Sequence, residues 1–272
     1  MINNERAIEL LMNILEEVDQ EEYPETIEVV EGSVFPDGDL LLDEPYEIAR
    51  GLMEADSTKE MPHEVGDYLA ETLLGEISDN NPDAATDLGS LYYTGRIGVQ
   101  DYTAAIRYYT IAAEQGEPQA QENLGYCYYY GRNVETDYEK AFHYFALGAF
   151  AGRTASLYKI GDMYRNGYFV DKNEREAFTI YERCFMNLND DNIEFFGADI
   201  MLRMGDCLYE GIGVAPDYTA ALSFYQRAEV MFFKRLQAGD FMIRRNYEKA
   251  IRRQGEVREK MKGDIPEFEW TK

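Results

Sequence analysis

The sequence predicts an all-α protein, an α-solenoid in which helix-turn-helix repeats stack side by side. Three observations predict it: an internal period of 36 residues, glycines and alanines at fixed places within that period, and apolar residues at helical spacing. The period is visible because segment 87–116 realigns with 123–152, 159–185 and 203–229. The spacing is 36, 36 and then 44, and the eight extra residues lie around 187–192. We therefore place four repeats at 82–117, 118–153, 154–197 and 198–230.

Each repeat begins with a helix that carries small or apolar residues on one face. In the first repeat these are Ala84, Leu88 and Leu91. Gly89 lies on the same face and has no side chain, so we expect a neighbouring helix to approach closely there. Further glycines follow six residues later, where a left-handed residue would end the helix: Gly95, Gly131, Gly167 and Gly211.

The second helix of each repeat begins after a short acceptor side chain, which can bond the free backbone N–H groups. These residues are Asp101, Asp137, Asn173 and Asp217. The helix then combines small and large residues on one face, as in Ala105, Tyr109 and Ala112. Neither helix can bury its apolar stripe alone, so stacked hairpins are expected to share one continuous core.

The motif L-G-x-L-Y-x-x-G, followed by G-V-x-x-D-x-x-x-A and an aromatic pair, resembles the Sel-one-like repeat family, a relative of the tetratricopeptide repeats. The fourth repeat carries the motif most fully: Gly211, Gly213, Val214, Asp217, Ala221, Phe224 and Tyr225. The second repeat has Asn133 at the second glycine, and the third lacks both that glycine and the aspartate. The resemblance covers residues 82–230. It implies a right-handed superhelix whose first helices line the concave side.

The two flanks differ in charge. Residues 1–81 hold 23 acidic and 3 basic residues, and we expect helices over 3–19, 45–56 and 63–78, the last two forming a degenerate capping repeat. Residues 21–44 fit either a short hairpin around Asp37-Gly38 or a loop. Residues 231–272 are expected to form a basic C-terminal helix and tail. Across this boundary we expect helices over 218–235 and 240–262, with a break at Gly239.

Composition excludes several functions. A net charge of −26 disfavours nucleic-acid binding, which needs clustered cations. Two histidines and three cysteines leave little for a metal site, and an odd cysteine count favours buried free thiols and a cytoplasmic location. No run of 18 uncharged apolar residues occurs, so no membrane association or export is expected. We predict no catalytic, metal-binding or cofactor-binding residue.

Tyrosines indicate a binding surface. The chain has 22 of them, many in the first helices, at positions off the packing stripe. Large rigid side chains are typical of protein interfaces. The expected partner-binding residues of the concave face are Tyr93, Tyr126, Tyr129, Tyr130, Asp162, Arg165, Asp206 and Tyr209. The alternative is that these tyrosines complete the core and place only their hydroxyls at its rim.

These observations favour a non-catalytic interaction module (an adaptor or scaffold) that binds a peptide or protein segment of unknown identity. An acidic inhibitor or immunity-type protein that neutralises a cationic partner is the alternative. A β-lactamase-like or penicillin-binding activity is raised only by the family resemblance. Ser156 and Lys159 have the spacing of that chemistry, but Ser156 occupies a small-residue packing position, which favours a structural role. The opposite charges of the two ends permit a homo-oligomer.

Overall fold

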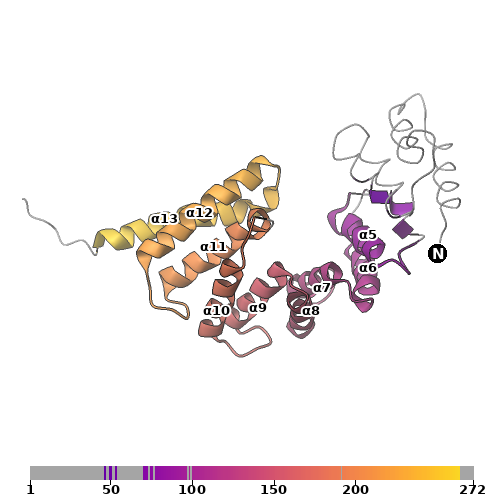
Figure 1. Cartoon of the computed structure of the whole chain (residues 1–272), viewed down its shortest axis with the longest axis horizontal. Coiled ribbons are helices and arrows are strands. Elements are labelled where there is room, and N and C mark those ends of the chain that lie inside the picture. The colour runs from indigo at the N-terminus through magenta and orange to yellow at the C-terminus, as the bar shows by residue number, and fades with distance from the viewer. Residues whose placement is uncertain are drawn as a thin grey trace, which may run out of the picture. The chain divides into compact units, whose positions relative to one another are not determined.

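The computed structural model describes residues 77–96, 98, 100–190 and 192–263, together with a few positions between 46 and 75. Within these residues every regular element is a helix (Figure 1). The α-helices are α5 (Pro82–Thr94), α6 (Tyr102–Glu114), α7 (Pro118–Tyr130), α8 (Tyr138–Phe150), α9 (Thr154–Asn166), α10 (Glu174–Met186), α11 (Ile193–Glu210), α12 (Tyr218–Gln237) and α13 (Arg244–Gly263), and a 3₁₀-helix, η2 (Phe241–Ile243), precedes α13.

Several expectations for the N-terminal region lie outside the described residues. The helix over 3–19 and the hairpin or loop over 21–44 lie wholly outside them. Only scattered positions of the expected helices over 45–56 and 63–78 are described, and those positions are helical except for Ser78, which lies in a turn.

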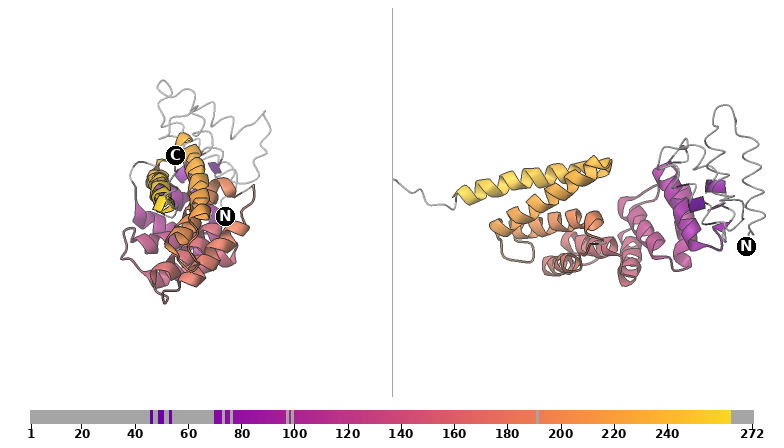
Figure 2. Two further views of the ribbon diagram at one scale, coloured as in Figure 1. Left: turned by 90° about the vertical axis from the view of Figure 1, so that its left-hand side faces the viewer. Right: turned by 45° about the horizontal axis from the view of Figure 1, so that its top comes forward.

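Consecutive helices pack against one another as hairpins. The contacts join α5 to α6, α9 to α10 and α11 to α12, and further contacts join α6 to α7 and α10 to α11. The chain divides into two compact units, residues 1–144 (unit 1) and 145–272 (unit 2), which we describe separately. The α11–α12 hairpin and the long α13 are seen in Figure 2 as the orange and yellow helices of unit 2.

Glycines in the first helices allow the close packing that the sequence predicted. A Cβ atom on Gly205 would stand 2.7 Å from the ring of Tyr225 in α12. The same distance separates a Cβ on Gly89 from Tyr109, and one on Gly161 from Tyr181. All three tyrosines are buried. The recurring glycine is therefore the site at which a tyrosine ring of the second helix sits directly against the backbone of the first.

The helix ends also follow the sequence. Gly95 lies in the left-handed region with φ 76°, and its N–H donates to the carbonyl of Leu91. The other three expected glycines end α7, α9 and α11 in the same way. Asp101 accepts hydrogen bonds from the N–H groups of Thr103 and Ala104 and so caps α6. These predictions are confirmed.

The fourth hairpin is longer than the others. α11 has 18 residues and α12 has 20, whereas each helix from α5 to α10 has 13. In the insertion before α11, the backbone N–H of Asn189 donates to the side chain of Asn192, and the N–H of Asn192 donates back to Asn189. The boundary that the sequence placed between 230 and 231 falls inside α12, because that helix continues to Gln237. The expected break is present at Gly239, with φ 94°.

Candidate partner-binding surfaces

Unit 1 holds two groups of contacting tyrosine rings, which we together call the tyrosine cluster. Its members come from the ends of α5 and α7 and from the starts of α6 and α8: Tyr93, Tyr102, Tyr126, Tyr129, Tyr130 and Tyr138. Tyr130 stacks on Tyr126 with ring centroids 6.2 Å apart and meets Tyr129 edge-on at 4.9 Å. Tyr129 contacts Tyr138 at 5.7 Å, and Tyr93 contacts Tyr102 at 5.1 Å. Four of the eight residues expected at the binding face therefore lie in this cluster.

Arg132 joins the two halves of the tyrosine cluster. Its guanidinium carbon lies 5.4 Å from the ring centre of Tyr102 and 5.7 Å from that of Tyr130. These are cation–π distances. The side chain is half-buried, and its Nε is a buried donor without an acceptor. Among the described residues no carboxylate lies within 4.0 Å of this arginine.

The cluster presents both ring surface and hydroxyl groups. Tyr130 is 50 % exposed, and the other five members are partly buried. Burial raises the pKa of Tyr93, an effect that the charge of Arg132 offsets only in part, so its hydroxyl stays protonated at neutral pH. Tyrosine rings that are held by their neighbours and carry hydroxyls at their edges are well suited to contact a partner chain.

Three of the other four expected residues, Asp162, Arg165 and Asp206, form ion pairs in unit 2. Asp206 is 1 % exposed and accepts a hydrogen bond of 2.9 Å from the Tyr225 hydroxyl. Lys249 and Arg253 of α13 approach its carboxylate at 2.5 Å and 3.5 Å, and Arg165 of α9 approaches at 3.4 Å. We call this group the Asp206 cluster. It ties α9, α11 and α13 together through one carboxylate.

Asp162 has an equivalent set of partners. Arg203 of α11 donates to both of its oxygens at 2.7 Å, and Tyr181 donates at 2.8 Å. Lys159 lies 3.5 Å away. Burial by itself raises the pKa of Asp162, but Arg203 and Lys159 outweigh that effect and hold the pKa at about 2. The carboxylate is therefore ionised and fully engaged within the chain.

The residue after the recurring glycine has a consistent role in three repeats. Ser90, Asp162 and Asp206 each hydrogen-bond the hydroxyl of the tyrosine 19 residues later. The second repeat carries Phe145, which has no hydroxyl, at the position of that tyrosine, and Tyr126 follows its glycine. The expectation that Asp162 and Asp206 face a partner overlooked this pairing, because it joins residues of two helices.

Arg165 and Tyr209 contribute to the same charged surface of unit 2. Arg165 also pairs with Glu210 at 3.1 Å. The guanidinium of Arg253 lies 5.1 Å from the ring centre of Tyr209, and Arg253 hydrogen-bonds Glu210 as well. These four expected residues of unit 2 are thus engaged by ion pairs and a cation–π contact within the chain.

Sequence reasoning missed Arg132, Tyr102 and Tyr138. A signal for the two tyrosines was present: each directly follows the aspartate that caps a second helix, and Tyr218 repeats the pattern in contact with Tyr209. Arg132 follows the C-capping Gly131, and nothing in its local sequence distinguishes it from a solvated turn residue.

The structure assigns no chemistry to the serine–lysine pair. Ser156 is fully buried in α9, and its Oγ would lie 2.5 Å from a Cβ built on Gly148. Lys159 is buried beside Asp162. The three cysteines are free and buried, and burial raises the pKa of each thiol to about 12. The described residues contain no group of His, Cys, Asp and Glu suited to a metal ion, and none of their helices is long and apolar enough to cross a membrane.

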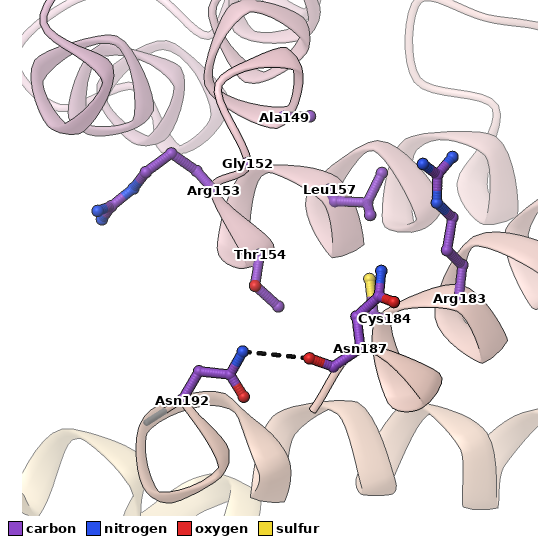
Figure 3. Close-up of a pocket in the computed structure, with 9 residues that line it drawn as sticks. All are labelled: Ala149, Gly152, Arg153, Thr154, Leu157, Arg183, Cys184, Asn187 and Asn192. Atoms are coloured by element: carbon purple, nitrogen blue, oxygen red, sulfur yellow. Dashed lines mark hydrogen bonds between the residues drawn. The ribbon is translucent and has the colours of Figure 1, made fainter. Parts of the chain in front are cut away.

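One small pocket lies in unit 2 beside the insertion that precedes α11 (Figure 3). It measures about 210 Å³. Its lining residues are Ala149, Gly152, Arg153, Thr154, Leu157, Arg183, Cys184, Asn187 and Asn192. Figure 3 shows that the Arg153 side chain points away from the other lining side chains, and that Asn192 bonds the carbonyl of Asn187. Burial raises the pKa of the Cys184 thiol, so this lining residue is protonated at neutral pH.

Comparison with known proteins identifies the family. The profile of the Sel1 repeat matches residues 82–117, 118–150, 154–183, 198–229 and 234–252, which together exceed half of the chain. The chain belongs to the Sel1 repeat family. Sel1 repeat proteins generally mediate protein–protein interactions and are generally non-catalytic scaffolds. The fifth match, 234–252, falls in the segment that the sequence analysis treated as a C-terminal helix. No curated protein matches the chain.

Two solved structures share the Sel1 repeat fold with this chain. A Sel1 repeat protein from Oxalobacter formigenes is 24% identical with a TM-score of 0.59, over 83% of this chain and 91% of that one. A protective antigen present in uropathogenic Escherichia coli strains, which displays an SLR fold, is 19% identical with a TM-score of 0.52. That match covers 94% of this chain and 56% of the antigen. At these identities the likeness concerns the fold.

Proposed function

We propose that this Sel1 repeat protein is a non-catalytic adaptor that holds a peptide or protein segment against the tyrosine cluster of unit 1. The observation that carries the proposal is the two groups of contacting rings that Arg132 joins through cation–π contacts. Rings that already contact one another lose little conformational entropy when a partner binds, so more of the contact energy contributes to affinity.

The contrast with unit 2 supports this choice. There, the side chains at equivalent positions are consumed by internal partners: Asp206 is buried among three cations, and Asp162 is held by Arg203. In unit 1, Tyr130 is half exposed at the corresponding end of its helix. A partner therefore gains accessible aromatic surface at the tyrosine cluster without breaking an ion pair.

The test is a photo-crosslinking experiment with the full chain in a lysate of its source cells. A photoreactive residue replaces Thr94, which is exposed at the end of α5 close to the cluster. We expect discrete crosslinked partners with the wild-type background and their loss when Tyr129 and Tyr130 are both changed to Ala. The matched control changes Tyr168, an aromatic of the third repeat outside the cluster, to Ala. Equal crosslinking in the folded double variant and in wild type would refute the proposal.

The charge of the chain favours a second candidate, an inhibitor that neutralises a cationic partner. Residues 1–81 hold 20 more acidic than basic residues, from 23 and 3. Such a complex forms by long-range attraction, so its association rate constant falls steeply between about 50 mM and 500 mM salt. A partner of the tyrosine cluster keeps most of its affinity over that range. Measuring association of any captured partner at both salt concentrations separates the two functions.

A further inference from the structure

We propose that the tyrosine cluster recognises a carboxylate, and that Arg132 is the residue that binds it. This proposal rests on the proposed function, since it names the chemistry of the segment that the cluster holds. The ligand is a peptide in which one acidic group, a side chain or a free C-terminus, lies next to apolar or aromatic residues.

The first argument is the state of Arg132. The residue is half-buried between two rings, its Nε is a buried donor with no acceptor, and the described part of the chain supplies no carboxylate to it. Besides its interaction with the Tyr93 hydroxyl, the guanidinium keeps N–H groups that can make charge-assisted hydrogen bonds to a carboxylate. Two planar N–H groups of arginine match the two oxygens of a carboxylate, so the geometry selects that group over a neutral amide.

The second argument comes from equivalent arrangements in unit 2. Arg203 lies over the ring of Tyr158 at 4.3 Å and binds Asp162. Arg253 lies over Tyr209 at 5.1 Å and binds Glu210. In both cases the chain completes an arginine–tyrosine pair with a carboxylate from another helix or turn. Arg132 has the rings, and no described residue supplies it with a carboxylate; in this proposal the partner supplies that group.

The third argument excludes a cationic ligand at this place. Aromatic surfaces attract lysine and arginine through the negative face of the ring. Here Arg132 already occupies the ring faces of Tyr102 and Tyr130. A second cation would meet a like charge in a site of reduced solvation, which is unfavourable. The cluster therefore prefers an acidic group, even though the chain as a whole is acidic.

The experiment is selection from a displayed library of random dodecapeptides on the immobilised full chain. We expect selected peptides to be enriched in Asp and Glu for wild type. The enrichment should disappear for Arg132→Gln, while aromatic and apolar residues stay enriched. The matched control is Arg107→Gln, which removes an exposed arginine that also lies over a tyrosine ring, Tyr108 at 5.2 Å. This control should keep the acidic enrichment.

A second measurement uses one selected peptide in fluorescence anisotropy. Changing its acidic residue to the amide should weaken binding to wild type by about tenfold or more, and binding to Arg132→Gln by less than about twofold. Versions with a free and an amidated C-terminus distinguish the two sources of the carboxylate. Arg132→Lys keeps the charge and loses the planar fork, so it should bind with intermediate affinity. Helical circular dichroism and the melting temperature show that each variant is folded.

The outcomes separate the two proposals. If wild type selects peptides that show no acidic enrichment, or if Arg132→Gln selects the same acidic peptides, the carboxylate proposal is wrong and the binding function stands. If wild type selects no peptide at all, both are overturned. Loss of selection in Arg132→Gln together with loss of its helical signal shows a folding defect, and the anisotropy measured with the wild-type chain and the acid-to-amide peptide then decides.

Discussion

Individual residues in this protein gain their roles from partners on another helix. Asp162 and Asp206 follow the recurring glycine, and each accepts a hydrogen bond from a buried tyrosine and charge from cationic side chains of neighbouring helices. A buried carboxylate that loses such partners is strongly destabilising, because its desolvation is no longer compensated. The two aspartates are thus structural residues of the repeat stack.

Asp162 provides a prediction about acid stability. Its pKa in the folded chain is about 2, below the ordinary value of 3.8, so the folded state binds the proton less readily than the unfolded state. The resulting stabilisation, about 2 kcal/mol, is present above pH 4 and is lost as the pH falls from 4 to 2. Urea unfolding at several pH values should show this loss in wild type.

The comparison with two variants isolates this residue from the many other acids of the chain. Asp162→Asn should be less stable at pH 7 by about 3 kcal/mol, because Arg203 is left without its carboxylate, and should lose less further stability between pH 4 and pH 2. Asp171→Asn, at an exposed position, should follow wild type throughout. An Asp162→Asn variant with the full acid-induced loss would contradict the assignment.

At the scale of elements, the last helix is held to the array by charge as well as by packing. α13 buries Ala250 and Val257 in the apolar core that α11 and α12 share, and Lys249 and Arg253 reach the Asp206 carboxylate. Its exposed positions include Arg244, Arg252 and Lys262.

Removing the central carboxylate should loosen α13. Asp206→Asn leaves Lys249, Arg253 and Arg165 without their shared partner, and we expect a cost of about 3 kcal/mol. Hydrogen exchange should become faster in α13 and in the adjoining part of α11. Glu210→Gln, which alters the exposed rim of the same cluster, should cost less than about 1 kcal/mol. Unchanged exchange in α13 after the Asp206 substitution would show that packing alone holds the helix.

For the whole molecule, a repeat architecture predicts that damage stays local. Hairpins contact mainly their neighbours in the chain, so stability is approximately a sum of repeat and interface contributions. We apply this additive description of stability to unit 1 and to unit 2 separately. Each contains a glycine against which a buried tyrosine ring sits at a distance that excludes a Cβ atom.

Two matched substitutions test this locality. Gly89→Ala and Gly205→Ala each force a methyl group to 2.7 Å from a buried ring, which should cost about 1–3 kcal/mol. Hydrogen exchange should increase in α5 and α6 for the first variant and in α11 and α12 for the second. Global destabilisation of the same size in both units by either variant would show that the chain unfolds as one cooperative body.

The sequence predicted the elements well because repetition supplies independent copies of each local signal. Gly95 and Gly211 end helices, Asp101 and Asp217 cap them, and Gly205 admits a tyrosine ring, all as the period implied. The family resemblance was confirmed on the same residues.

The site could be predicted only in part, because side-chain partners come from different helices. Tyr130 was recognised as a surface residue, whereas the pairing of Asp206 with Tyr225 depends on how α11 meets α12. Arg132 was missed because its significance arises from rings 30 residues earlier and two residues earlier in the chain, Tyr102 and Tyr130. A local sequence pattern does not show which side chains of other helices a residue contacts.

Because the hydrogen-bonding residue and its tyrosine are always 19 residues apart, the two positions can be substituted together in any one repeat. The hydroxyl of the buried tyrosine pairs with a serine or an aspartate at the residue after the glycine, and a phenylalanine removes that requirement. Substituting both positions of one repeat by the pair found in another would place a tyrosine or an aspartate after the glycine of a chosen hairpin. The interior volume would stay almost constant, because tyrosine and phenylalanine differ by one oxygen atom.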